Sequence, residues 1–333
     1  MENIQATPSR FLHVANGTST TRLIEAAGIP GALSIWADPL VEGPVPAGLT
    51  DAELLDLRTR HLGGVYGSHD PVNDMAQWRA AIERHHDDDE VVLWFEHDLF
   101  DQLNLIQLLS WIRERLPSTK PVSLVCIGSF PGRPAFKGLG ELTPGLLAPL
   151  MDTRQPVTDV QFMLAERAWL AFRQPSPEAL DDLRQGETTA LPFLASVLTR
   201  FLQEFPSTID GLSRTERRLM QLAAEGGVTL LQAFPRMHDD EDAYYVADLS
   251  MVHLAEQLSQ TSPALLTLTP GKETGARVLR RLVTITETGR NVLAARQDKI
   301  NTCVIDRWLG GVHLQSGGPI WRWDDARLRI TLT

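Results

Sequence analysis

The chain has 333 residues, of which 43% are hydrophobic and 22% are charged. This composition allows a large buried core and predicts two or three domains. Its two cysteines, Cys126 and Cys303, lie far apart without a CxxC motif, which argues against a disulfide framework and against a thiolate metal site. The first ten residues are polar, and no apolar run approaches the roughly 20 residues that span a bilayer. We therefore expect a cytoplasmic protein without a membrane partner.

Charge is distributed unevenly along the chain. Residues 1–206 contain 27 Asp and Glu against 16 Lys and Arg, whereas residues 207–333 contain 15 of each kind. The net charge of −11 is thus a property of the N-terminal part. A negative field repels nucleic acid, so we do not expect nucleic acid as a partner of this part.

The N-terminal part alternates strand and helix signals. Short apolar runs predict strands at 11–15, 32–37, 91–95 and 122–128. Capping residues and helical apolar spacing predict helices at 21–27, 51–62, 74–86 and 102–116. Two prolines and a glycine in 42–46 predict a loop that joins neither helix nor sheet. This alternation predicts an α/β fold with a Rossmann-like, mostly parallel sheet over residues 1–138.

The strand signal ends near residue 139. Proline-punctuated helical patterns at 142–151, 157–172, 177–185 and 190–205 predict a helical connector over residues 139–206. Residues 207–333 then show a helix at 213–226, where Ser213 and Glu216 are spaced as a capping box. Helices at 228–235 and 247–260, β-prone segments at 265–269 and 281–286, and a helix at 288–299 follow. This order predicts a winged-helix-like α+β domain with a polar tip at 270–275. The 247–260 helix has no Lys or Arg, which disfavours DNA binding.

A polar cluster follows the buried strand at 91–95. Glu96, His97 and Asp98 stand where a parallel strand passes into its helix, the edge at which open α/β sheets bind ligands. Clustered carboxylates raise one another's pKa and a histidine can move protons, so we predict these three as catalytic residues. Carboxylates also suit a divalent metal such as Mg²⁺. In the alternative interpretation, Asp98 or Asp101 caps the next helix, and Glu96 and His97 are solvated.

Further residues are predicted to bind the ligand. Asn16, Gly17, Thr18 and Ser19 follow the first strand and open a helix, whose N–H groups could hold a phosphate or carboxylate, although no Walker A or GxGxxG pattern is present. In the alternative, Thr18, Ser19 or Thr20 is a simple N-cap. Four further residues complete the predicted ligand-binding set. Asp38 ends the second strand, Glu42 follows in the next loop, and Asp101 and Gln102 stand where the helix after 91–95 begins. We expect Asn16, Asp38 and Glu96 to converge at one edge of the sheet.

Several motifs together resemble a bacterial family that is catalogued as a domain of unknown function. The motifs are His13 to Ser19, Trp36 to Asp38 with Glu42 to Pro46, Leu93 to Gln102, Gly138 to Leu142, Asp306 to Gly311 and Trp321 to Asp324. The family usually has Asp-Ser where this chain has Thr18-Ser19, so the resemblance does not imply a carboxylate at position 18. It covers nearly the whole chain and implies that the two parts belong together, without an established reaction.

These observations lead to two hypotheses of different classes. The first is a hydrolase or transferase that acts on a phosphorylated or polar small molecule at the carboxyl edge of the N-terminal sheet. The second is a metabolite-sensing regulator whose winged-helix-like domain binds DNA or a partner protein. The Glu96 cluster favours the enzyme, and the domain order favours the regulator.

Overall fold

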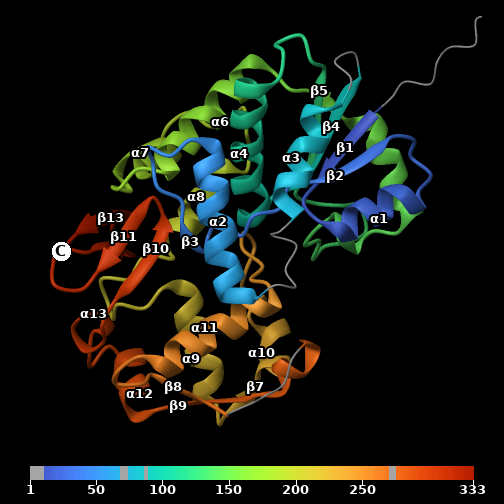
Figure 1. Ribbon diagram of the computed structural model, residues 1–333. Coiled ribbons are helices and arrows are strands. Elements are labelled where there is room, and N and C mark those ends of the chain that lie inside the picture. The colour runs from blue at the N-terminus through green and yellow to red at the C-terminus, as the bar shows by residue number, and fades with distance from the viewer. Residues whose placement is uncertain (1–10, 68–73, 86–88, 270–274) are drawn as a thin grey trace, which may run out of the picture. The chain divides into compact units, whose positions relative to one another are not determined.

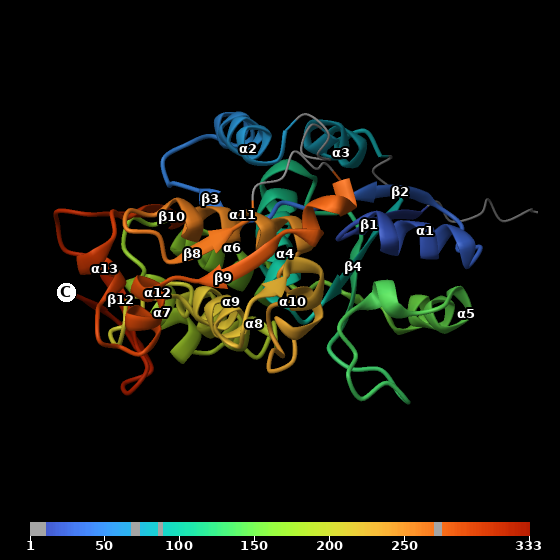
Figure 2. The same cartoon turned by 90° about the horizontal axis from the view of Figure 1, so that it is seen from below.

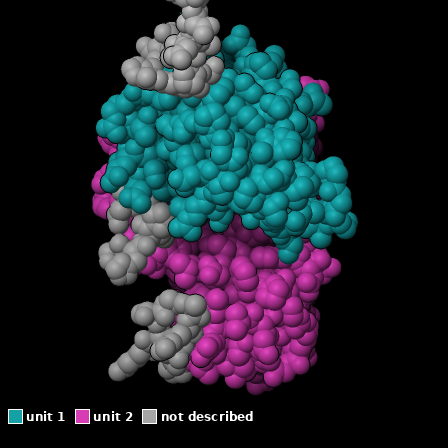
Figure 3. Space-filling view, turned by 90° about the vertical axis from the view of Figure 1, so that its right-hand side faces the viewer, with its two compact units in different colours: residues 1–39, 71–169, 188–193 teal, residues 40–70, 170–187, 194–333 magenta. Residues whose placement is uncertain are grey.

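The computed structural model describes residues 11–67, 74–85, 89–269 and 275–333, which form a mixed α/β structure (Figure 1). The chain divides into two compact units. The first contains Met1–Pro39, Pro71–Trp169 and Thr188–Phe193, and the second contains Leu40–Asp70, Leu170–Glu187 and Leu194–Thr333 (Figure 3). Each unit is assembled from separate stretches, so the two alternate along the chain. The three successive domains with boundaries at 138 and 206 stay a prediction.

The first unit is built on a mostly parallel sheet of five strands in the order β2-β1-β4-β5-β6. Its four parallel strands are β1 (Phe11–Ala15), β2 (Ala32–Ile35), β4 (Glu90–Glu96) and β5 (Val122–Ile127). The antiparallel edge strand β6 (Gln155–Pro156) was not predicted, because a proline lacks the N–H group that a strand interior needs. An edge position tolerates that loss, and the following Val157 N–H donates to the Val122 carbonyl at 2.9 Å.

Helices cover both faces of this sheet. On one face α1 (Thr18–Ala26), η2 (Leu139–Glu141) and α5 (Pro144–Leu147) enclose a core that includes Ile24, Trp94 and Leu147. On the other face lie α3 (Met75–Glu83) and α4 (Leu99–Arg115), and Trp36 packs between Arg79 of α3 and Trp111 of α4. Figure 2 shows α3 and α5 on opposite sides of the strands. The remaining helical segments of this part are η3 (Ala148–Thr153) and α6 (Asp159–Phe172), the latter crossing the boundary between the units.

The start of α1 differs from the prediction. The helix begins at Thr18, three residues earlier than expected, with Gly17 at the N-cap position and no side-chain cap bond. The interpretation of Thr18, Ser19 or Thr20 as its cap is therefore wrong. Thr18 and Ser19 are instead exposed residues of the first turn.

The described residues of the second unit form three small sheets. The antiparallel sheet β7-β9-β8 is made of β7 (Val228–Thr229), β9 (Leu282–Ile285) and β8 (Leu266–Leu268). It is accompanied by α9 (Arg214–Ala224), α10 (Leu230–Arg236), α11 (Asp248–Gln260), η4 (Gly275–Arg280), α12 (Glu287–Leu293) and α13 (Lys299–Thr302). The predicted Ser213 and Glu216 capping box at α9 is present. Of the predicted polar tip, residues 270–274 lie outside the described residues.

The other two sheets involve strands that the sequence analysis did not predict. β10 (Asp306–Gly310) pairs with β11 (Val312–Gln315) and, in parallel, with β3 (Gly43–Pro44), while β12 (Trp321–Asp324) pairs with β13 (Arg329–Leu332). The prediction that 42–46 joins no sheet is thus wrong. Its ladder uses the Val45 N–H, which donates to the Gly310 carbonyl at 2.8 Å, so the prolines need no N–H of their own.

The unit is completed by three further helices, α2 (Asp51–Tyr66), α7 (Glu178–Gln185) and α8 (Leu194–Leu202). Thr50 and Glu53 form a capping box at the start of α2. None of the helices in the described part of the chain combines the length and the apolar character required to cross a bilayer.

Candidate functional site

The site lies at the carboxyl edge of the sheet of the first unit. Asn16 follows β1 and Glu96 ends β4, and these strands are parallel neighbours. The Asn16 Nδ2 atom donates to Glu96 Oε2 at 3.1 Å and to Asp101 Oδ2 at 2.9 Å. Its Oδ1 atom accepts from the Thr20 hydroxyl at 2.9 Å. The Asn16 amide is therefore fixed in one orientation and holds two carboxylates together.

The first turn of α4 places the other carboxylates. Asp98 is the N-cap, and its Oδ1 atom accepts from the Asp101 N–H at 2.8 Å. The Asp101 side chain turns back, so that its Oδ1 atom accepts from the Glu96 N–H at 2.8 Å. The capping alternative is correct for Asp98 and wrong for Asp101. Glu96 is buried rather than solvated, at 5% exposure.

Glu96, Asp98 and Asp101 form a buried acidic triad. One oxygen of each lies within 4.8 Å of the others, so the three could hold a metal ion. Burial and the nearby Asp98 charge raise the pKa of Glu96 to about 8, and burial raises the pKa of Asp98 to about 6. Burial, followed by the charges of Glu96 and Asp98, also raises the pKa of Asp101. Near neutral pH the triad therefore retains protons unless a cation compensates its charge.

The donor set fits a hard divalent cation. Carboxylate oxygens are the ligands that Mg²⁺ prefers, and the triad supplies three such groups from one strand end and one helix start. Among the described residues, no Lys or Arg forms an ion pair with any of the three, so no side chain of that kind already takes the place of a cation.

The segment after β5 forms another wall of the site, which the sequence analysis missed. The Leu139 N–H donates a hydrogen bond to Glu96 Oε1. A Cβ atom on Gly138 would lie only 2.6 Å from Glu96 Oε2, so this position requires glycine for space, its backbone being extended with φ 172. The signal in the sequence was Gly138-Leu139-Gly140, whose glycines permit a close approach of the backbone.

Gln102 and Cys126 support the end of β4, and the ligand-binding role of Gln102 stays a prediction. Gln102 Nε2 donates to the Glu96 carbonyl at 2.6 Å and to Cys126 Sγ at 3.4 Å. Burial raises the pKa of the Cys126 thiol to about 12, so this cysteine stays protonated and is a poor nucleophile.

His97 points into an aromatic environment. Its ring lies 6.4 Å from the Phe136 ring and 6.0 Å from the Phe193 ring, measured between centroids. A Cβ atom on Gly128 would come within 3.0 Å of the His97 Cβ and 2.7 Å of Phe193, so a glycine gives this pair its space. The catalytic role of His97 stays a prediction.

Asp38 shares the edge but is held through its backbone. Its N–H donates to Asn104 Oδ1 at 2.8 Å, and its carbonyl accepts from Asn104 Nδ2 at 2.9 Å. These two hydrogen bonds tie the segment after β2 to α4, one turn beyond Asp101. Asn104 is a positioning residue that the sequence analysis missed, because an amide inside a helix carries no distinctive signal.

Glu42 belongs to the second unit. There its carboxylate accepts a hydrogen bond from the Tyr66 hydroxyl, and its backbone carbonyl accepts one from Arg58. The structure thus gives Glu42 a setting of its own, separate from the contacts of the acidic triad.

No protein-family model and no curated protein matches the chain. Among solved structures, the fold is similar to the DNA-binding, cleavage and re-ligation domain of Plasmodium falciparum topoisomerase II, with a TM-score of 0.48 and 11% identity. The match covers 100% of this chain and 57% of that chain, so this chain spans little more than half of that structure. A similarity of this degree supports no statement about activity.

Proposed function

We propose that the first unit is a Rossmann-like enzyme of hydrolase or transferase type that acts on a phosphorylated or otherwise polar metabolite at the carboxyl edge of its sheet. The observation that carries this proposal is the buried acidic triad Glu96, Asp98 and Asp101. Buried charges are normally paired or coordinate a metal. No Lys or Arg of the described residues pairs with these three carboxylates, so they either retain protons or bind a cation.

The proposed cofactor is a divalent cation such as Mg²⁺, held by the oxygens of the triad. When bound, it would polarise a phosphoryl oxygen or lower the pKa of a water molecule. Asn16 orients the Glu96 and Asp101 carboxylates for this task through its two hydrogen bonds. The Leu139 N–H fixes the other Glu96 oxygen.

The start of α1 is the proposed place for a phosphate or carboxylate of the substrate. Its first turn carries no acidic residue and Gly17 provides no side-chain cap, so the N–H groups of the first turn are available to an anion. Thr18 and Ser19 are exposed there and stand beside the end of β1, next to Asn16. His97 is the proposed proton carrier.

Cation binding gives the direct test. We expect Mg²⁺ or Mn²⁺ to raise the melting temperature of the wild-type protein and to give a saturable isotherm in calorimetry. Asp98→Asn should abolish both responses, because it removes one ligand charge while keeping the helix cap. Glu114→Gln, which changes an exposed carboxylate on the same helix, should respond like the wild type. Responses that are the same in Asp98→Asn and in the wild type would reject the triad as the site.

Turnover is tested separately on a panel of nucleotides and sugar phosphates, by measuring phosphate release with and without Mg²⁺. Activity that depends on the cation and disappears in Asp98→Asn supports the proposal. Cation binding without turnover of any phosphorylated compound would reject the hydrolase assignment and leave the metal site.

A second candidate is a metabolite-sensing regulator. The order α9, α10, α11, β8 and β9 supports the interpretation of a winged-helix domain. However, Arg281 beside the expected wing forms an ion pair with Glu256 of α11, which lowers the positive charge open to DNA. We therefore expect weak or no specific DNA binding at physiological salt, and nanomolar, salt-sensitive binding to a defined duplex would favour the regulator. A cytoplasmic location and membership of the bacterial family of unknown function remain part of the proposal.

A further inference from the structure

The second unit contains a cavity of about 150 Å³ that is separate from the acidic triad in its lining. Its wall is built by segments that lie far apart in the sequence: residues 41–43, His61 of α2, Glu204, Thr215 of α9, Tyr244 with Val246, one face of α11, and residues 306–308 of β10. The motifs at 42–46 and 306–311, which were far apart in the sequence, meet here because β3 pairs with β10.

α11 turns a polar face to the cavity. Ser250, His253 and Gln257 are spaced three and four residues apart, so they lie on one side of the helix, and all three line the cavity. This is the helix that a DNA-binding winged helix would use for recognition.

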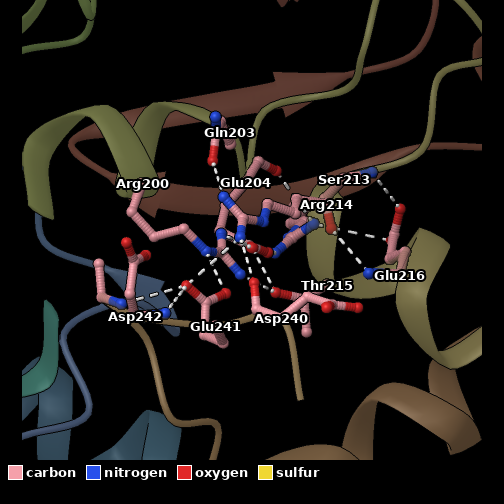
Figure 4. Close-up of polar contacts among 12 residues, drawn as sticks. Arg200, Gln203, Glu204, Ser213, Arg214, Thr215, Glu216, Asp240, Glu241 and Asp242 are labelled. Atoms are coloured by element: carbon pink, nitrogen blue, oxygen red, sulfur yellow. Dashed lines mark hydrogen bonds and ion pairs between the residues drawn. The ribbon is translucent and has the colours of Figure 1, made fainter. Parts of the chain in front are cut away.

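Glu204 and Arg307 of the cavity lining belong to an ion network, part of which is drawn in Figure 4. Arg200 forms ion pairs with Glu204 at 2.6 Å and Glu241 at 2.7 Å, and Arg307 reaches Glu204 at 3.4 Å. Although burial alone would raise it, the Arg200 and Arg307 guanidiniums hold the pKa of the Glu204 carboxyl below its usual range. Lys299 and Glu216 add one further pair at 2.5 Å. Glu204 is therefore neutralised by its own basic partners, without a ligand.

The Tyr244 hydroxyl also indicates that the cavity binds a ligand. Tyr244 is only 9% exposed, lines the cavity and packs its ring 5.1 Å from the Arg200 guanidinium. Among residues 11–67, 74–85, 89–269 and 275–333, none is hydrogen-bonded to this hydroxyl. Burial raises its pKa well above the usual range, so the group remains a donor at neutral pH. The hydroxyl of a largely buried tyrosine usually has a hydrogen-bond partner, and a ligand in the cavity could provide one here.

Acceptors stand across the same space. The Glu42 carboxylate accepts from Tyr66, and a carboxylate has lone pairs for further donors. Asp306 lies at the rim, paired with His313 at 2.6 Å, and the Trp308 ring is stacked on the His313 ring at 4.3 Å. The cavity lining thus combines hydrogen-bond donors and acceptors with the aromatic ring of Trp308.

This mixture selects the chemical class of the ligand. An anion would meet Glu42, Glu204 and Asp306. An ammonium group could not accept from Tyr244 or Arg307. A hydroxyl group both donates and accepts hydrogen bonds, so it can pair with the donors and with the acceptors of the cavity lining. We infer that this cavity binds a small, uncharged, hydroxyl-rich molecule such as a single sugar ring or a cyclic polyol. The volume agrees with that size, since pockets for drug-sized ligands occupy about 300–1,000 Å³.

The test titrates the full-length protein with D-glucose, D-ribose and myo-inositol, using saturation-transfer NMR and calorimetry. Putrescine and inorganic phosphate serve as the cationic and anionic comparisons. We expect at least one of the hydroxyl-rich compounds to bind saturably and the two ions not to compete with it. A panel in which no hydroxyl-rich compound binds, or in which only putrescine or phosphate does, overturns the inference.

Two variants locate the binding. Tyr244→Phe keeps the ring over Arg200 and removes the donor, so affinity should fall about tenfold. Tyr245→Phe removes the neighbouring hydroxyl, which does not line the cavity, and should bind like the wild type. Circular dichroism establishes that both are folded, and Glu42→Gln gives the same test if Tyr244→Phe does not fold. Unchanged affinity in both Tyr244→Phe and Glu42→Gln would overturn the site. None of these outcomes depends on the triad, so the enzyme proposal stands or falls separately.

Discussion

Asn16 and Glu96 are 80 residues apart in the sequence and are joined by a hydrogen bond of 3.1 Å from Asn16 Nδ2 to Glu96 Oε2. The same nitrogen reaches Asp101 Oδ2 at 2.9 Å. Asn16 therefore contributes to the site by positioning two carboxylates. Both protons of its amide group are used in these contacts, and direct contact of Asn16 or of the first turn of α1 with a substrate stays a prediction.

The residue at position 16 should control how strongly the site depends on a cation. Asn16→Asp places a fourth carboxylate beside Glu96 and Asp101, so in EDTA we expect a lower melting temperature than in the wild type. In MgCl₂ the variant should recover more stability than the wild type does. Asn16→Ala also loses its hydrogen bonds, at a cost of about 1–3 kcal/mol, but Mg²⁺ should not restore it. Equal recovery of the two variants would contradict this prediction.

Substitutions at Asp98 should separate capping from ligand binding. Asn caps a helix about as well as Asp, and removing one crowded charge relieves repulsion, so Asp98→Asn should be as stable as the wild type or more stable in the absence of metal. Asp98→Ala loses the cap to the Asp101 N–H and should be less stable than Asp98→Asn by about 1 kcal/mol. Chemical denaturation in EDTA measures both. A marked loss of stability in Asp98→Asn would mean that the charge itself holds the fold.

Gly138 and Gly140 form a matched pair for the wall of the site. Gly138→Ala would place a methyl group 2.6 Å from Glu96 Oε2, so we expect displacement of Glu96, a loss of about 1–3 kcal/mol and loss of the response to Mg²⁺. Gly140→Ala meets only the Ser19 Cβ at 3.5 Å, an ordinary contact, and should change little. Equal melting temperatures and Mg²⁺ responses for the two variants would refute the close approach.

The triad should also make the metal-free protein less stable as the pH rises. Glu96 and Asp98 have pKa values of about 8 and 6 in the folded protein, above the ordinary values of 4.5 and 3.8, so folding takes up protons between these limits. Their contribution is most favourable below about pH 4 and is lost as the pH rises through 6 and 8. Glu96→Gln removes the upper part of this dependence. The check compares denaturation midpoints in EDTA across this range, and parallel curves for the two proteins would argue against it.

In the second unit, Glu204→Gln should be strongly destabilising. It leaves Arg200 buried with one anionic partner fewer, which typically costs about 3–5 kcal/mol. Glu225→Gln alters an exposed pair with Arg236 and should cost less than about 1 kcal/mol. Urea denaturation of both variants gives the comparison, and a small effect at Glu204 would show that the network tolerates an uncompensated charge.

Local chemistry explains why many elements could be predicted from the sequence. The apolar runs at 11–15, 91–95 and 122–128 became neighbouring parallel strands, and the capping box at Ser213 appeared as expected. A cap or an apolar strand depends on a few adjacent residues, so its signal is complete within a short window. The polar cluster after β4 was located for the same reason.

The sequence by itself determined that strands and helices alternate in the N-terminal part and that carboxylates gather where β4 passes into α4. Tertiary structure alone decided which groups share a site. It brought Asn16 and Leu139 to Glu96, and it gave Glu42 to the second unit through the pairing of β3 with β10. These outcomes depend on strand order and on contacts between distant segments, whose free energies come from packing and desolvation and leave no periodic trace in the sequence.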